Sequence, residues 1–155
     1  MIIPLNLPKA NLRLKRKGEQ VFVWCIIRQM DLLCTPEEWV RQHIIHYLIN
    51  QKQIPKGLIA SEFVVEYNGM RKRADIVVFD KNHSPILIVE CKAPEIPIDE
   101  KVLLQIATYN SQLNVPFLFL TNGIKHQIIG RENGVWKKFS DLPDYKELLH
   151  FNSFF

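Results

Sequence analysis

The chain has 155 residues, a length that suits one domain, with residues 1–17 as a basic N-terminal arm. Its hydrophobic fraction of 47% is ordinary for a globular protein, no apolar run is long enough to cross a bilayer, and the net charge of +4 favours an anionic partner. The N-terminus lacks the layout of a signal peptide, and the three cysteines have no metal-type spacing. We therefore expect a cytoplasmic protein that does not bind membranes.

The N-terminal part of the chain predicts an arm followed by a pair of strands. Residues 1–17 contain two prolines and then a basic cluster, which indicates an arm that is extended or loosely packed. Residues 20–27 are rich in apolar β-branched and aromatic residues and predict a strand, with residues 30–33 as its hairpin partner.

A strong helix start follows the strand pair. Thr35 can cap a helix, Pro36 suits the first helical position, and Glu38 stands three residues after Thr35, as in a capping box. We expect this helix to run to about Asn50.

Three strands come next. Residues 62–67 and 72–79 flank Asn68-Gly69, which is typical of a type I′ hairpin turn, and residues 85–91 predict a further strand. The last two of these strands carry continuous apolar runs. Such runs indicate strands that are covered on both faces, and hence a central sheet with helices packed on it.

The second half of the chain predicts a crossover helix and more strands. Asp99 can cap a helix that runs to about Leu113, and residues 116–120 predict a buried strand that ends at Asn122-Gly123. A hairpin of residues 124–129 and 135–139, a short helix over 143–149, and an apolar end with Phe151, Phe154 and Phe155 complete the chain. We expect these phenylalanines to dock on this subunit or on a second one.

The order of these elements predicts an α/β fold with a mixed (α+β) sheet. Tight turns join the three central strands, so we expect them to be antiparallel neighbours. The strand that begins near residue 117 follows a helical crossover, so we expect it to lie parallel to the strand at 85–91.

Asp75 and the Glu90-Cys91-Lys92 segment are the candidate catalytic residues. Side chains alternate along a strand, so Glu90 and Lys92 share a face about 6.6–6.8 Å apart, and Asp75 can join them from the neighbouring strand. Two such carboxylates and the backbone carbonyl of Cys91 can hold Mg²⁺, which prefers oxygen ligands. Lys92 could then position or deprotonate a water molecule, or neutralise charge on a phosphate.

An ion pair between strand ends is the alternative explanation of these residues. We favour a metal site because Asp75 and Glu90 flank strongly apolar runs, where an unpaired carboxylate would be costly. Glu37 could join the site, since it lies three, seven and eleven residues before the apolar stripe of its helix. Its alternative role is to stabilise the helix dipole, and Glu38 is better explained by the capping box.

Other polar residues are candidates for contacts with a nucleic acid. Gln105 and Tyr109 are four residues apart and share one face of the crossover helix. The expected phosphate contacts are Lys15, Arg16 and Lys17 in the arm and Arg71, Lys72 and Arg73 before the strand of Asp75. A solvated tail and hairpin rim would explain the same basic residues.

Taken in order along the chain, these motifs resemble the PD-(D/E)xK nuclease superfamily. They are most similar to stand-alone relatives of the N-terminal nuclease domain of type I restriction enzyme R subunits. The matching segments are Thr35-Pro36-Glu37-Glu38-Trp39-Val40-Arg41-Gln42, Arg73-Ala74-Asp75-Ile76-Val77, Val89-Glu90-Cys91-Lys92-Ala93-Pro94, Gln105-Ile106-Ala107-Thr108-Tyr109-Asn110 and Leu120-Thr121-Asn122-Gly123.

The resemblance implies a restriction-endonuclease-like core of helix, three antiparallel strands, helix and strand, here with extra β-hairpins at both ends. It also implies Mg²⁺ at Asp75 and Glu90, Lys92 as the catalytic lysine, Glu37 as a helical acid, and a Gln-x-x-x-Tyr element at Gln105 and Tyr109. One departure is that a chain of this length has no room for the ATP-driven motor of R subunits.

Two main hypotheses follow for the function. The first is a metal-dependent nuclease, an endonuclease related to restriction-modification, that cleaves DNA with Mg²⁺, with Mn²⁺ as the alternative ion and RNA as the alternative substrate. The second is a nucleic-acid-binding or assembly module that cleaves only with a partner subunit, or as a homodimer. Hydrolysis of a phosphoester outside nucleic acids is a third, weaker alternative.

Overall fold

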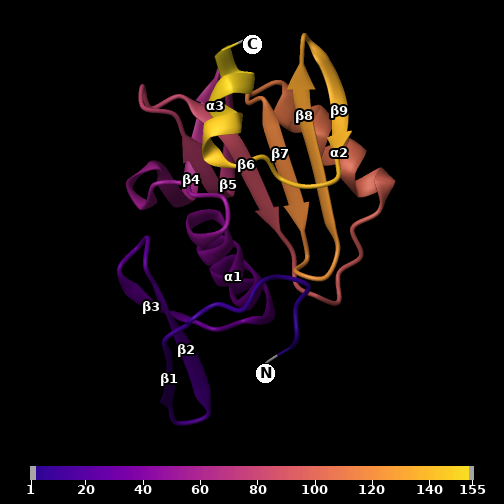
Figure 1. Ribbon diagram of the computed structural model, residues 1–155. Coiled ribbons are helices and arrows are strands. Elements are labelled where there is room, and N and C mark those ends of the chain that lie inside the picture. The colour runs from indigo at the N-terminus through magenta and orange to yellow at the C-terminus, as the bar shows by residue number, and fades with distance from the viewer. Residues whose placement is uncertain (1–2, 154–155) are drawn as a thin grey trace.

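The computed structural model of the protein describes residues 3–153 and is built around a six-stranded sheet (Figure 1). Its strands lie side by side in chain order: β4 (Ile59–Tyr67), β5 (Met70–Phe79), β6 (Pro85–Cys91), β7 (Phe117–Thr121), β8 (His126–Glu132) and β9 (Val135–Phe139). β6 and β7 are parallel, and the other neighbours in this sheet are antiparallel. The predicted mixed sheet, with its hairpin after β7, is confirmed.

Helices cover both faces of the six-stranded sheet. α1 (Pro36–Asn50) and α3 (Tyr145–Ser153) pack on one face and α2 (Glu100–Ser111) on the other, while a short 3-10 turn, η1 (Lys56–Leu58), precedes β4 (Figure 1). Each face has its own apolar cluster: Val89 belongs to the α1 side and Ile88 to the α2 side. The continuous apolar run of β6 is thus explained, because both of its faces are buried.

Both long helices, α1 and α2, begin with the predicted N-cap residues. The hydroxyl of Thr35 accepts a hydrogen bond from the Glu38 backbone N–H at 3.1 Å, and the carboxylate of Asp99 accepts one from the Val102 N–H at 2.9 Å. The second half of the expected capping box is wrong. The side chain of Glu38 turns inward to Arg41 instead, because Arg41 is buried and requires an anionic partner.

The N-terminal region departs from prediction, because residues 14–17 form a strand instead of a loose arm. They build β1 (Leu14–Lys17), which joins β2 (Gln20–Cys25) and β3 (Met30–Leu33) in a separate three-stranded sheet. The predicted N-terminal hairpin is therefore one strand larger. β1 was not predicted, because all four of its residues are exposed and its sequence does not alternate between apolar and polar residues.

The chain ends against the central core. Phe151 on α3 places its ring 5.3 Å from that of Phe117 and 5.6 Å from that of Phe139, so this part of the apolar end docks on its own subunit. Phe154 and Phe155, which were expected to dock as well, lie outside the described residues. Among residues 3–153, every helix is too short or too polar to span a membrane.

The ladder between β4 and β5 is irregular beside Asp75, one of the candidate site residues. The ladder between β4 and β5 keeps its register on both sides of residue 62, but Glu62 and Asp75 are missing from its paired residues. Glu62 adopts a positive φ of 57°, which is strained for a residue with a side chain. The alternation of faces changes here, since Ile76 belongs to the α1-side cluster and Ala74 to the α2-side cluster.

Candidate functional site

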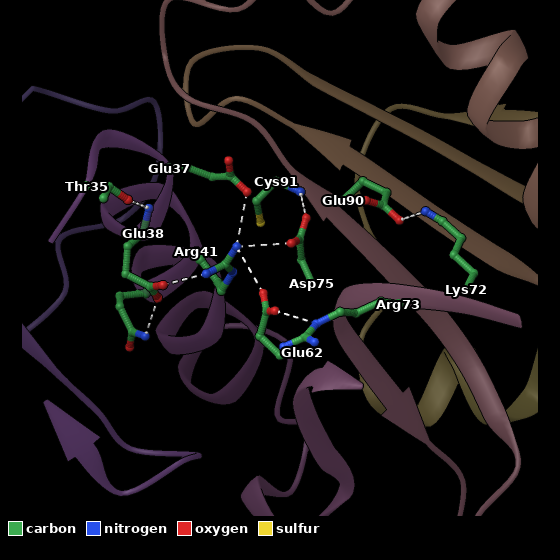
Figure 2. Close-up of polar contacts among 11 residues, drawn as sticks. Thr35, Glu37, Glu38, Arg41, Glu62, Lys72, Arg73, Asp75, Glu90 and Cys91 are labelled. Atoms are coloured by element: carbon green, nitrogen blue, oxygen red, sulfur yellow. Dashed lines mark hydrogen bonds and ion pairs between the residues drawn. The ribbon is translucent and has the colours of Figure 1, made fainter. Parts of the chain in front are cut away.

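Asp75 lies where β5 and β6 separate. The ladder between the two strands pairs Ile76 with Val89, and no pair of residues 75 and 90 continues it. Asp75 fills the gap with its side chain, because its Oδ2 accepts a hydrogen bond of 2.7 Å from the backbone N–H of Cys91 (Figure 2). The thiol of Cys91 is buried on the α1 side, so Glu90 lies on the opposite face, as predicted.

Arg41 on α1 collects acidic side chains from three elements. Its Nη2 lies 3.0 Å from Asp75 Oδ1, 3.1 Å from Glu37 Oε1 and 3.3 Å from Glu62 Oε1, and its Nη1 donates to Glu38 (Figure 2). Burial alone would lower the pKa of Arg41, but Glu38 and Asp75 outweigh it and raise the pKa above the ordinary value. The guanidinium therefore stays charged and holds Asp75 against the helix.

Glu90 is held separately on the α2 face. Its carboxylate accepts from Lys72, whose ammonium lies 5.7 Å from the centre of the Tyr109 ring, and the Tyr109 hydroxyl donates to the Arg71 carbonyl at 2.9 Å. Burial raises the pKa of Glu90, the hydrogen bond and charge of Lys72 oppose this, and repulsion from Asp75 adds to it. Lys72, expected to contact phosphate, instead directs its ammonium into the site.

Glu37 and Lys92 lie near the two carboxylates but make fewer contacts. The pKa of Glu37 is raised by burial first and by repulsion from Asp75 second, while Arg41 and Lys92 lower it. Lys92 also lowers the pKa of Glu90. Within residues 3–153 the ammonium of Lys92 has no ion pair, although its backbone N–H donates to the Thr121 carbonyl at 2.8 Å. Lys92 is thus the cation of the site that is available to a ligand.

The other predicted residues lie further from the carboxylates. Gln105 is exposed on α2 and makes no side-chain hydrogen bond in the described part of the chain, so it is not joined to the site as Tyr109 is. Arg71 pairs with Glu66, Arg73 pairs with Glu62, Lys15 lies 3.8 Å from Asp31, and Arg16 and Lys17 are exposed on β1. The basic residues therefore occupy two separate surfaces.

The donor set suits a hard divalent cation. Burial is the main cause of the raised pKa of Glu37 and of Glu90, and repulsion from Asp75 adds to both, so a cation beside Asp75 would relieve that repulsion. Carboxylate oxygens are the ligands that Mg²⁺ prefers. Over residues 3–153 no three acidic, histidine or cysteine side chains gather as a metal cage. The predicted site requires two carboxylates and a carbonyl, and it stays a prediction.

Sequence reasoning missed Arg41 and Glu62. A signal for Arg41 was present, because it stands four residues after Glu37 and three before Ile44, on the apolar stripe of α1. An arginine in that stripe requires buried anionic partners. Glu62 carried no such signal, because its position depends on an irregularity between two strands.

Two comparisons with known proteins found similarities to this chain. Residues 36–144 match the family model described as the N terminus of the type I restriction enzyme R protein. A solved fragment of a putative HsdR subunit of a type I restriction enzyme from Vibrio vulnificus is similar at 23% sequence identity and a TM-score of 0.47, covering 61% of this chain and 20% of that one. The similarity thus extends over about a fifth of that longer chain. A search of curated proteins gave no match.

Proposed function

The chain belongs to the family of type I restriction enzyme R protein N termini, and from this we propose that it is a Mg²⁺-dependent nuclease that hydrolyses phosphodiester bonds in DNA. The observation that carries the proposal is that Asp75 and Glu90 stand next to the last pair of the β5–β6 ladder, where the charge of Asp75 raises the pKa of Glu90. Lys92 lies two residues beyond Glu90 and has no ion pair among the described residues. Two crowded carboxylates and an available lysine suit a cation and a phosphate together.

Asp75, Glu90 and the backbone carbonyl of Cys91 would hold the ion in this proposal. When bound, Mg²⁺ supplies Lewis-acid polarisation of the phosphoryl oxygen and lowers the pKa of a coordinated water. The hydrogen bond from the Cys91 N–H fixes the carboxylate of Asp75 before any ligand arrives. Such prior orientation spares the entropy that a mobile carboxylate would lose on binding.

Lys92 and Glu37 have the charges required next to the scissile phosphate. The ammonium of Lys92 would hydrogen-bond a phosphate oxygen and neutralise charge that grows there during cleavage. Glu37 has a raised pKa and a side chain that is 45% exposed, so its carboxylate can exchange a proton with solvent at the mouth of the site. Gln105 and Tyr109 on α2, with Arg71 and Arg73, would contact the nucleic acid beside it.

A cleavage and stability assay tests the proposal. The purified chain is incubated with plasmid, linear duplex and single-stranded DNA, and in parallel with RNA, in Mg²⁺, Mn²⁺ or EDTA. We expect cleavage with the divalent ions, and loss of cleavage in Lys92→Ala and Asp75→Asn. Mg²⁺ should also raise the melting temperature of the wild type but not of Asp75→Asn, because only a bound ion stabilises the fold. Absence of both cleavage and stabilisation would refute the proposal.

A second candidate is supported by the pairing of both metal-site carboxylates with protein cations. Arg41 contacts Asp75 and Lys72 contacts Glu90, so the site is neutralised internally. Such a chain would be a nucleic-acid-binding or assembly module that cleaves only when a partner subunit or a second copy displaces these pairs. It predicts salt-sensitive DNA binding without turnover, whereas rapid cleavage by the isolated chain would exclude it.

A further inference from the structure

The three-stranded sheet of β1, β2 and β3, here called the small sheet, has one face that carries none of the residues of the proposed nuclease site. Cross-strand partners lie on the same side of a sheet, and the buried Val23 and Cys25 mark the side that faces the core. The opposite side, here called the outer face, carries Arg13, Lys15, Lys17, Phe22, Trp24, Asp31 and Leu33. Arg16 belongs to the core side by alternation, so the basic cluster of the arm is divided between two faces.

The outer face has three cations beside two aromatic rings. It also carries Asp31, which stands opposite Trp24 and lies 3.8 Å from Lys15. Lys15 pairs across the ladder with Phe22, and the backbone carbonyl of Arg13 accepts a hydrogen bond from the Trp24 backbone N–H at 2.9 Å. The Arg13 guanidinium lies 5.0 Å from the centre of the Trp24 ring, and the Lys17 ammonium lies 5.7 Å from that of Phe22. Lys15 and Lys17 stand on β1 at the edge of the sheet, Arg13 directly precedes β1, and the half-buried rings stand on β2.

We propose that the outer face binds a single-stranded segment of nucleic acid, with bases on Phe22 and Trp24 and phosphates on Arg13, Lys15 and Lys17. This inference rests on the proposed function and names the form of substrate that the nuclease site receives. Two features support a nucleic acid as the occupant. The three cations outnumber the carboxylate of Asp31 and complement a chain of phosphates, and an aromatic surface accepts any base without regard to sequence.

The spacing of the rings selects a single strand over a duplex. Phe22 and Trp24 are two residues apart on one strand, which separates them by about 6.6–6.8 Å. This is about twice the 3.4 Å between stacked bases of a duplex strand. Each ring therefore suits one base of an extended strand, whereas the paired and stacked bases of a duplex cannot reach a flat sheet face.

The cations that now lie over the rings do not prevent such binding. Cation–π contacts at exposed sites are weak, and stacking of a base on an aromatic ring is stronger. Arg13 and Lys17 are both exposed and can turn outward to a phosphate. Binding therefore exchanges a weak internal contact for a base stack and an ion pair with the backbone.

The outer face is connected to the candidate site by a short stretch of chain. Leu33 ends β3 on this face and is 45% exposed, and Thr35 then caps α1, whose first turn carries Glu37. Figure 1 shows the small sheet beside α1, projecting beyond the end of the central sheet at which β6 and β7 finish. A strand that lies along the outer face can thus continue towards the carboxylates.

Binding in EDTA tests the proposal independently of cleavage. The probes are a fluorescent single strand of about 12 nucleotides, within the range of known single-strand sites, and its duplex. We expect the single strand to bind more tightly, and Trp24→Leu to weaken it by about 10- to 100-fold. Lys15→Ala and Lys17→Ala should weaken binding and reduce its salt dependence, whereas the matched control Lys146→Ala, exposed on α3, should not.

The outcomes separate this inference from the proposed function. Equal affinity for single strand and duplex, or a loss in Lys146→Ala as large as in Lys17→Ala, would overturn the inference even if the protein cleaves DNA. If Trp24→Leu fails to fold, as judged by circular dichroism, the Lys15→Ala and Lys17→Ala variants decide the question. Selective binding that persists in Asp75→Asn, together with no cleavage by the wild type in Mg²⁺, would support the outer face and refute the nuclease.

Discussion

Asp75 and Glu90 stand on neighbouring strands, yet the protein balances their charges in different ways. Asp75 shares the guanidinium of Arg41 with Glu37, Glu38 and Glu62, and its second oxygen accepts from a backbone N–H. Over residues 3–153, Glu90 has one ion pair, with Lys72 from the adjacent strand. Asp75 is therefore fixed by a network that several elements build, whereas Glu90 depends on one flexible side chain.

The difference indicates which carboxylate is ready for a ligand. A guanidinium presents a planar fork that binds several carboxylates in fixed directions, while a lysine ammonium is a point charge on a mobile stem. Asp75 is consequently preorganised, and Glu90 can exchange Lys72 for another cation with little rearrangement. Substitutions at Arg41, Lys72, Glu90 and Tyr109 should therefore differ in their effects on stability.

The largest effect is expected from Arg41→Met. It leaves the buried Glu38 and the largely buried Asp75 without their cation, and loss of one partner of a buried ion pair costs about 3–5 kcal/mol. Urea unfolding at neutral pH in EDTA measures the loss. Arg73→Met is the matched control, because its pair with Glu62 is exposed and its removal should cost at most about 1 kcal/mol. Equal losses in the two variants would contradict the central role of Arg41.

Lys72→Met should destabilise less, by about 1–3 kcal/mol, because it leaves one buried acceptor unsatisfied. Glu90 can take up a proton in response, since its pKa is already raised. The double variant Lys72→Met/Glu90→Gln should recover much of the loss, because neither ion is then left alone. A double-mutant cycle by urea unfolding measures the coupling, and purely additive losses would show that the pair is not a unit.

Glu90→Gln should change how stability varies with pH. Burial raises the pKa of Glu90 in the folded state above the unfolded value near 4.5. Between these two pKa values the folded state binds more protons than the unfolded state, so the free energy of unfolding falls as pH rises. Below this pH window Glu90 is protonated in both states and does not change the free energy of unfolding. Above it, the cost of burying the ionised carboxylate is present in full. Removal of Glu90 should flatten that fall, by no more than about 1.4 kcal/mol per pH unit. Thermal melts across the acidic range in EDTA test the sign.

The smallest effect is expected from Tyr109→Phe. It removes the hydrogen bond to the Arg71 carbonyl, worth about 0.5–1.5 kcal/mol at most, and keeps the ring beneath Lys72. Because Tyr109 is 40% exposed, water can replace the lost donor, so the melting temperature should fall only slightly. Tyr109→Ala also removes the ring and should lower it more. Equal melting temperatures for these two variants would mean that the ring contributes nothing to holding Lys72.

Local signals account for the parts of the fold that were predicted. Thr35 and Asp99 cap helices through their own side chains, and Asn68 and Gly69 both adopt the positive φ of a type I′ turn, so neighbouring residues alone determine these features. The exposed strand β1 could not be predicted, because its pairing with β2 depends on backbone hydrogen bonds that leave no pattern in its side chains.

The site was predicted only as far as residue types reveal it. Asp75, Glu90 and Lys92 stand out because charged residues interrupt apolar strands. Lys72 was assigned to phosphate as part of the basic cluster at 71–73. Its contact with Glu90 could not be predicted, because alternation counted along β5 does not reveal the change of face beside Asp75. Arg41 and Glu62 belong to the site through contacts with segments that are distant in the sequence. Arg41 and Asp75, for example, are 34 residues apart. Such contacts become visible only when the strands are placed side by side.

The positive φ of Glu62 sets stability and activity against each other at one position. Glycine would hold this backbone conformation with less strain, yet it would remove a carboxylate from Arg41. A screen that rewards heat resistance alone should therefore accept Glu62→Gly more readily than a screen that rewards DNA cleavage. Directed evolution for thermal stability alone would thus select against a residue of the proposed site at position 62.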